Sequence, residues 1–142
     1  MGKFNPLFMG ELKKWVPDIC EDQIVELGGS NLDLSEPQKK VKSITVIFED
    51  AIRVYTDGAL ILEERLENVE KLQIIQGVGC VFAEYVKKGS DEHVLFARAD
   101  SRYQGPMGAF VKRVNYFLRS GDRDFSRLKQ AKGRICPKCG KP

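Results

Sequence analysis

The sequence predicts an α+β domain in which an antiparallel sheet, or a pleckstrin-homology-like (PH-like) barrel, of about six strands is capped by a C-terminal amphipathic helix. Two patterns support this: apolar and polar residues alternate through residues 43–98, and a clean helical stripe follows at 106–119. The chain has 142 residues, of which 42% are hydrophobic and 30% charged, enough for one domain with its own core.

Residues 1–42 are expected to form N-terminal helices and a connection. Residues 4–16 carry an apolar stripe at helical spacing, and Pro17 should end or restart that helix. Asp18 can cap a second short helix that runs to Leu27 and ends at Gly28-Gly29. Residues 31–42 are polar and contain a proline, so they should form an irregular connection or a weak edge strand.

Residues 43–120 are expected to hold the sheet and its capping helix. Asp57-Gly58 lies between two apolar runs and predicts a tight turn, because glycine tolerates positive φ. Ser120-Gly121 should end the helix. The stripe of the helix consists of Met107, Phe110, Val111, Val114, Phe117 and Leu118.

Charge divides the chain into an acidic body and a basic end. Residues 1–101 carry 12 Lys/Arg and 18 Asp/Glu, whereas residues 102–142 carry 11 and 2. We therefore treat residues 121–142 as a basic tail, which could meet anionic lipid, nucleic acid or an acidic protein face, or simply be solvated. No apolar run approaches the roughly 20 residues needed to cross a bilayer, and the N-terminus lacks a secretory signal.

Catalysis is not expected. His93 is the only histidine, and no serine or cysteine motif marks a nucleophile near it. The segment Gly77-Val78-Gly79 lacks the lysine of a phosphate loop and predicts a turn or bulge. The carboxylates of Glu63, Glu64, Glu67 and Glu70 are expected on solvated strand and turn faces.

Cys136 and Cys139 are the sharpest motif of the sequence. Two thiolates in a Cys-Pro-Lys-Cys-Gly turn can hold one side of a tetrahedral zinc ion, which is half of a zinc ribbon. Cys20 and Cys80 are too far apart in the sequence to form the matching pair. The other two ligands would come from a longer parent protein or from a second chain, or the motif is vestigial.

Several segments occur together in one kind of protein, in this order: residues 52–58, residues 69–72, residues 76–80, an amphipathic helix and the Cys136–Gly140 knuckle. In them the chain resembles the cytoplasmic N-terminal domain of a bacterial ABC transporter, of the exporter type with fused permease and ATP-binding parts. The chain departs from a whole transporter because it has no membrane helix and no P-loop.

This resemblance implies a non-catalytic accessory or regulatory domain at the cytoplasmic face of the inner membrane. Its partners would be the transporter's membrane and ATP-binding domains, with anionic lipid near the basic tail. ATP would be bound only by the parent protein. Of the site residues, only Cys136 and Cys139 transfer, as zinc ligands whose partner pair lies outside this chain.

Two other functions and a homodimer stay open at this point. A zinc-ribbon module could bind nucleic acid, although Phe125 is the single aromatic residue after the long helix, which leaves few surfaces for base stacking. A PH-like domain could bind a lipid headgroup, although Asp50 and Asp57 make the visible turns acidic.

Overall fold

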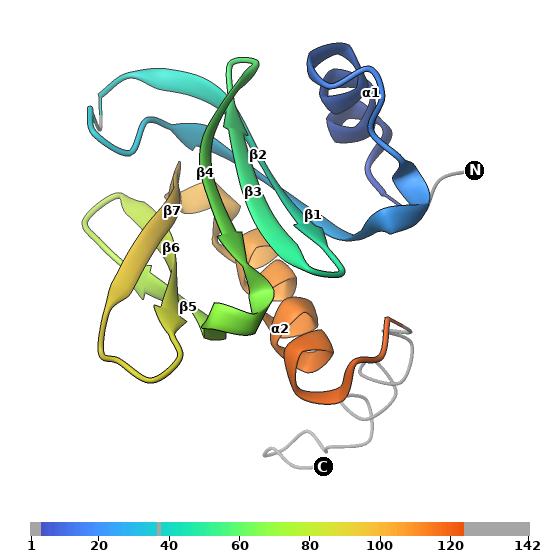
Figure 1. Cartoon of the computed structure of the whole chain (residues 1–142). Helices are drawn as coiled ribbons and strands as arrows, with labels where there is room; N and C mark the ends of the chain where they lie inside the picture. The colour runs from blue at the N-terminus through green and yellow to red at the C-terminus, as the bar shows by residue number, and fades with distance from the viewer. Residues whose placement is uncertain (1–3, 37, 124–142) are drawn as a thin grey trace, which may run out of the picture.

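The computed structural model describes residues 4–36 and 38–123. It confirms an α+β domain with an antiparallel sheet and a C-terminal helix (Figure 1). The helices are α1 (Pro6–Trp15) and α2 (Gln104–Ser120), with 3-10 turns at Glu21–Gln23, Leu66–Asn68 and Ser101–Tyr103. The seven described strands are β1 (Ile24–Leu32), β2 (Lys40–Phe48), β3 (Ala51–Thr56), β4 (Ala59–Arg65), β5 (Val69–Gln76), β6 (Cys80–Lys87) and β7 (His93–Asp100).

The sheet is a single antiparallel array in the order β4-β3-β2-β1-β7-β6-β5. It consists of two meanders, β1–β4 and β5–β7, that meet where Leu32 pairs with Arg98. β4 and β5 are the two outer strands and do not pair with each other, so the sheet is not closed. None of the helices in the described part of the chain is long and apolar enough to cross a membrane.

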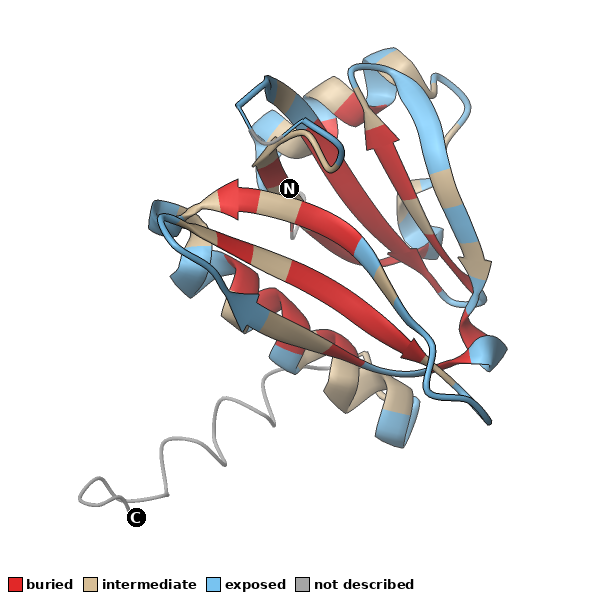
Figure 2. Ribbon diagram, turned by 90° about the vertical axis from the view of Figure 1, so that its left-hand side faces the viewer, coloured by how far each residue is buried: buried red, intermediate tan, exposed pale blue. Residues whose placement is uncertain are grey.

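The two helices cover opposite sides of β1 (Figure 1). The buried stripe of α2 packs on the main core, to which both meanders contribute, and Figure 2 shows how far the inner strands are buried. α1 packs on a second cluster formed by the outer face of β1–β3, including Ile44 and Val46. Asn115 of α2 also accepts from the Leu72 amide at 2.8 Å and donates to its carbonyl at 2.9 Å, which ties the helix to β5.

The structure confirms the predicted C-terminal helix and the predicted tight turn at Asp57-Gly58. Asp57 and Gly58 have φ values of 48° and 90°, as a tight two-residue hairpin turn requires. The helix ends at Gly121, whose φ is 73° and whose amide donates to the Phe117 carbonyl at 2.7 Å. This left-handed residue is a common helix terminator, because glycine has no Cβ to clash.

The predicted second helix over 18–27 is wrong. A 3-10 turn is followed by β1, which raises the strand count to seven and takes residues 31 and 32 from the predicted connection. Ile24 lies in the second cluster, beneath α1, and Val25 lies in the main core, beneath α2. Both residues are fully buried. Because both faces of β1 are covered, its residues do not alternate in polarity, and the spacing of Ile24 and Leu27 resembles a helix instead.

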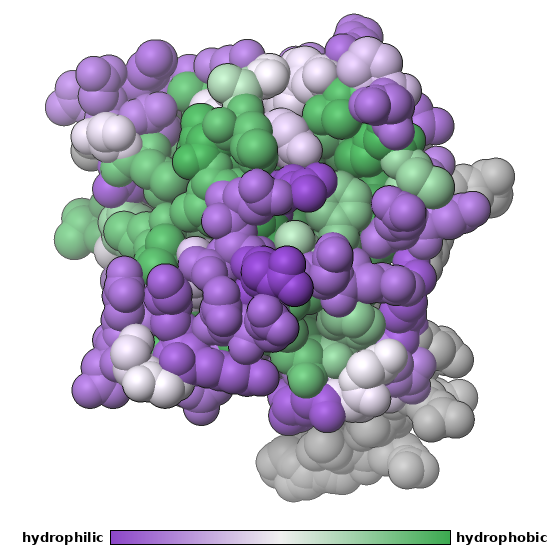
Figure 3. Space-filling model, in the orientation of Figure 1, coloured by the Kyte–Doolittle hydropathy of each residue, from purple (hydrophilic) through white to green (hydrophobic). Residues whose placement is uncertain are grey.

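The open side of the sheet exposes several apolar side chains. Leu60 and Ile61 of β4 are 48% and 50% exposed, and Ile75 of β5 is 41% exposed. Figure 3 shows apolar surface between hydrophilic side chains on this face of the molecule. A sheet can accept another strand at an unpaired strand edge. The edge of β4 is more accessible than that of β5, because the Asn115 side chain already hydrogen-bonds to the Leu72 backbone in β5.

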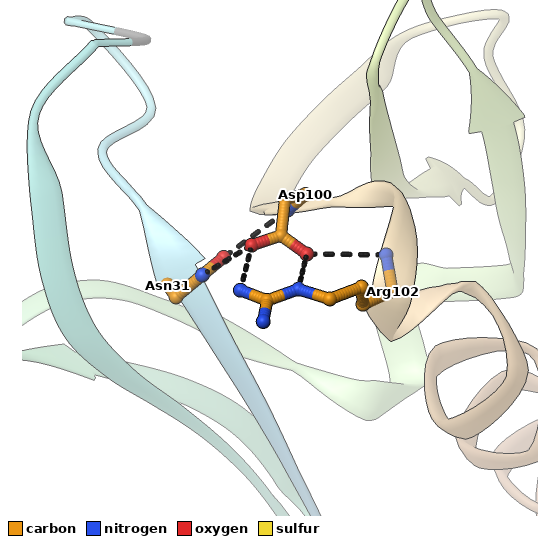
Figure 4. Close-up of polar contacts among 3 residues, drawn as sticks. All are labelled: Asn31, Asp100 and Arg102. Atoms are coloured by element: carbon orange, nitrogen blue, oxygen red, sulfur yellow. Dashed lines mark hydrogen bonds and ion pairs between the residues drawn. The ribbon is translucent and has the colours of Figure 1, made fainter.

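Side chains close the seam between the two meanders (Figure 4). Asn31 of β1 donates to the Asp100 carboxylate at 2.8 Å and accepts from the Asp100 amide at 3.1 Å. Arg102 donates to the same carboxylate from Nε at 3.1 Å and from Nη2 at 2.8 Å. The Arg102 guanidinium, and then Asn31, hold the pKa of Asp100 well below its usual range.

We expect acid to weaken this seam. Because the folded-state pKa of Asp100 is lowered, its contribution to stability is complete above the unfolded pKa, about 3.8, and is lost as pH falls through the folded value. Asp100→Asn should therefore lower Tm at pH 7, and the difference from the wild type should shrink below about pH 4. Thermal unfolding between pH 7 and pH 2 measures this difference, with Asp91→Asn in the exposed β6–β7 loop as the control. A difference that is independent of pH would contradict the assignment.

Candidate binding cleft

The described part of the chain contains a cleft of about 1000 Å³. It lies between the N-terminal end of α1, the middle of β1 and the first half of α2. Much of its wall is apolar and aromatic, contributed by Phe4, Phe8, Phe96, Tyr103, Met107 and Phe110. Apolar concave sites with a few polar groups are the usual form of a ligand site.

Gly28 and Gly29 of β1 let aromatic rings lie directly on the strand. A Cβ atom at Gly28 would come within 2.9 Å of the Phe110 ring, and one at Gly29 would clash with the Phe8 ring. Phe110 belongs to α2 and Phe8 to α1, so this glycine pair lets both helices approach one strand. The local sequence predicts a helix end at Gly28-Gly29, and it carries no signal for this role because Phe8 and Phe110 are distant in the chain.

A charged pair joins β1 to α2 within the cleft wall. Glu26 is 7% exposed, and its Oε2 accepts from Nε of Arg113. Both residues line the cleft. A carboxylate buried to this extent needs cationic or hydrogen-bonding partners, and Arg113 is one of them, so it contributes to the stability of this wall.

Arg123 lines the cleft from the segment that follows α2. Its Nη1 lies 2.7 Å from Oε2 of Glu49, in the β2–β3 turn. Its Nη2 donates to the carbonyls of Asp22 at 3.0 Å and Ile24 at 2.8 Å. These contacts fix the chain that leaves α2 against the start of β1.

Cys136 and Cys139, the predicted metal ligands, lie outside the described residues. Cys20 is exposed and Cys80 partly buried, and neither forms a disulfide. Within 4–36 and 38–123, no group of three or more His, Cys, Asp or Glu side chains is placed to hold a metal ion. The zinc prediction therefore stays a prediction.

The other residues considered for chemistry lie apart from the cleft. Nδ1 of His93 lies 2.7 Å from Oε2 of Glu84, which also accepts from Gln73. Gly79 has φ of 73° and the Gly77 amide donates to the Cys80 carbonyl at 2.9 Å, so this segment is a turn, as predicted.

Glu64 differs from the predicted solvated carboxylates. Its Oε1 accepts from the Tyr85 hydroxyl at 2.9 Å and lies 3.6 Å from Nζ of Lys87. Asn68 donates to its other oxygen at 2.9 Å. Hydrogen bonds from Asn68 and Tyr85 lower the pKa of Glu64, while burial raises the pKa of Tyr85. Glu64 thus joins the end of β4 to β6 across the open side of the sheet.

Comparison with models of known protein families found no match. Comparison with curated proteins also found no similar sequence. A functional proposal therefore depends on the arrangement of the strands and on the sequence resemblance.

Proposed function

We propose that this chain is a PH-like, non-catalytic module that positions or regulates an ATP-driven ABC exporter through protein contacts. The order of the strands is the observation that supports it best. Two antiparallel meanders pack on one C-terminal helix, which covers the apolar end that an open, bent sheet leaves exposed. We interpret this arrangement as a PH-like barrel whose corner between β4 and β5 is open.

The segments that resemble the exporter family add support. Residues 52–58 form most of β3 and its turn, and residues 69–72 begin β5. Residues 76–80 form the turn into β6. They therefore lie in strands and turns of both meanders. A fold alone does not determine a function, so the proposal depends on this sequence resemblance as well as on the strand order.

In this proposal the basic tail leads to the zinc knuckle and then to the membrane domain at the cytoplasmic face of the inner membrane. Each Lys or Arg close to an anionic lipid surface would contribute about 1 kcal/mol to binding it. Cys136 and Cys139 would supply two of four zinc ligands. Zinc analysis of the full-length protein and of its Cys136→Ser variant tests this, and an unchanged zinc content would contradict it.

The accessory role is tested on the full-length gene product. The gene should continue after codon 142 into a permease and an ATP-binding domain, and the purified full-length protein should hydrolyse ATP in lipid vesicles. Chain 1–142 alone should not hydrolyse ATP. It should bind the transporter from which residues 4–123 have been deleted, as measured by co-purification. A gene without a permease and a P-loop, or ATP hydrolysis by chain 1–142, would overturn the proposal.

A further inference from the structure

We propose that the cleft between α1, β1 and α2 binds a single-chain anionic amphiphile, such as an acyl carboxylate. The acyl chain would lie among the aromatic side chains, and the acid group would pair with Arg123. This inference rests on the geometry of the cleft and does not depend on the proposed transporter role.

The apolar walls and the size of the cleft favour a small amphiphile. Phe4 and Phe8 approach from α1 and its preceding residues, and Met107 and Phe110 approach from α2. The volume of about 1000 Å³ lies at the upper end of the range for small-molecule sites, roughly 300–1,000 Å³. A flexible acyl chain suits such a space, because its burial is favourable in proportion to the apolar area removed from water.

The charges of the cleft favour one negative charge on the ligand. Its charged lining residues are Glu26, Arg113 and Arg123. Glu26 pairs with Arg113, and the other cation, Arg123, pairs with Glu49 at 2.7 Å. The partner of Arg123, Glu49, does not line the cleft, and its side chain is 61% exposed and therefore screened by solvent. A ligand carboxylate in the cleft would compete with the solvent-exposed Glu49 side chain for the guanidinium of Arg123.

Titration of chain 1–142 with octanoate, decanoate and dodecanoate tests the proposal, at concentrations below micelle formation and with calorimetric detection. Affinity should rise about fourfold for each added methylene group. Dodecanol, which has the same chain without the charge, should bind at least tenfold more weakly than dodecanoate. Equal binding of the alcohol, or no dependence on chain length, would overturn the proposal.

Two substitutions locate the site. Ala109 is exposed on α2 and lines the cleft, so Ala109→Trp should fill the space and weaken dodecanoate binding at least tenfold. Arg119→Trp places the same side chain on α2 outside the cleft and should leave binding unchanged. Thermal unfolding of both variants shows whether they fold, and equal affinities in folded variants would contradict the assignment.

The acid group is tested separately. Arg123→Gln should weaken dodecanoate binding about tenfold and leave dodecanol binding unchanged, whereas Arg119→Gln should affect neither ligand. Binding to vesicles of anionic phospholipid shows whether the acyl chain in the cleft comes from a free carboxylate or from a membrane lipid. If the source is a membrane lipid, Ala109→Trp should weaken vesicle binding; if it is a free carboxylate, only the soluble ligand is affected. A variant Arg123→Gln that binds dodecanoate as the wild type does would overturn the role of Arg123.

Discussion

Leu12→Ala is expected to lower the free energy of unfolding by about 2–5 kcal/mol, whereas Leu7→Ala should change it by less than about 0.5 kcal/mol. Both leucines lie in α1, but Leu12 is fully buried and Leu7 is 79% exposed. The same atoms are removed from the same helix, so helix propensity is matched. Urea denaturation followed by circular dichroism measures the two values.

The size of this difference measures how firmly α1 covers the sheet. The cluster beneath α1 contains Ile44, Val46 and Tyr55, which lie on the outer face of β2 and β3. Without α1 these side chains would face water, and an apolar patch of this kind promotes association. If both variants lost the same small amount of stability, α1 would not be part of the folded core.

Local patterns predicted α2 and the hairpins formed by β2–β4. α2 has one buried face, so its apolar residues recur at helical spacing, and Gly121 marks its end. The β2–β4 hairpins were indicated by β-branched residues and by Asp57-Gly58. In each case the local backbone is determined by a single residue or by the spacing of apolar residues along a short segment. The sequence alone is therefore sufficient to predict these elements.

β1 and the cleft could not be predicted because they depend on contacts between distant segments. β1 is covered on both faces, by α1 and α2, so its residues show no alternation. Its glycines are explained by Phe8 and Phe110, which come from opposite ends of the chain. Glu26 and Arg113 are 87 positions apart, and nothing in either local sequence indicates that they meet. The predicted metal ligands remain outside the described residues.

Arg113→Ala is expected to lower the free energy of unfolding by about 3 kcal/mol, because it removes the guanidinium that pairs with the buried Glu26 carboxylate. The expected value lies at the lower end of the range for buried pairs, since the Arg113 side chain is 35% exposed. Arg119→Ala, which removes an exposed arginine from the last turn of the same helix, should change stability by less than about 1 kcal/mol. Urea denaturation of both variants at pH 7 measures the difference.

The double variant Glu26→Gln with Arg113→Gln separates loss of the pair from loss of packing. It removes both charges of the pair and keeps two side chains that can hydrogen-bond to each other, so it should recover most of the stability that Arg113→Ala loses. A double-mutant cycle built with Glu26→Gln and Arg113→Gln should then show a coupling energy above about 1 kcal/mol. A coupling energy near zero would mean that the two side chains are independent, and Arg113 would then stabilise α2 only through the apolar part of its side chain.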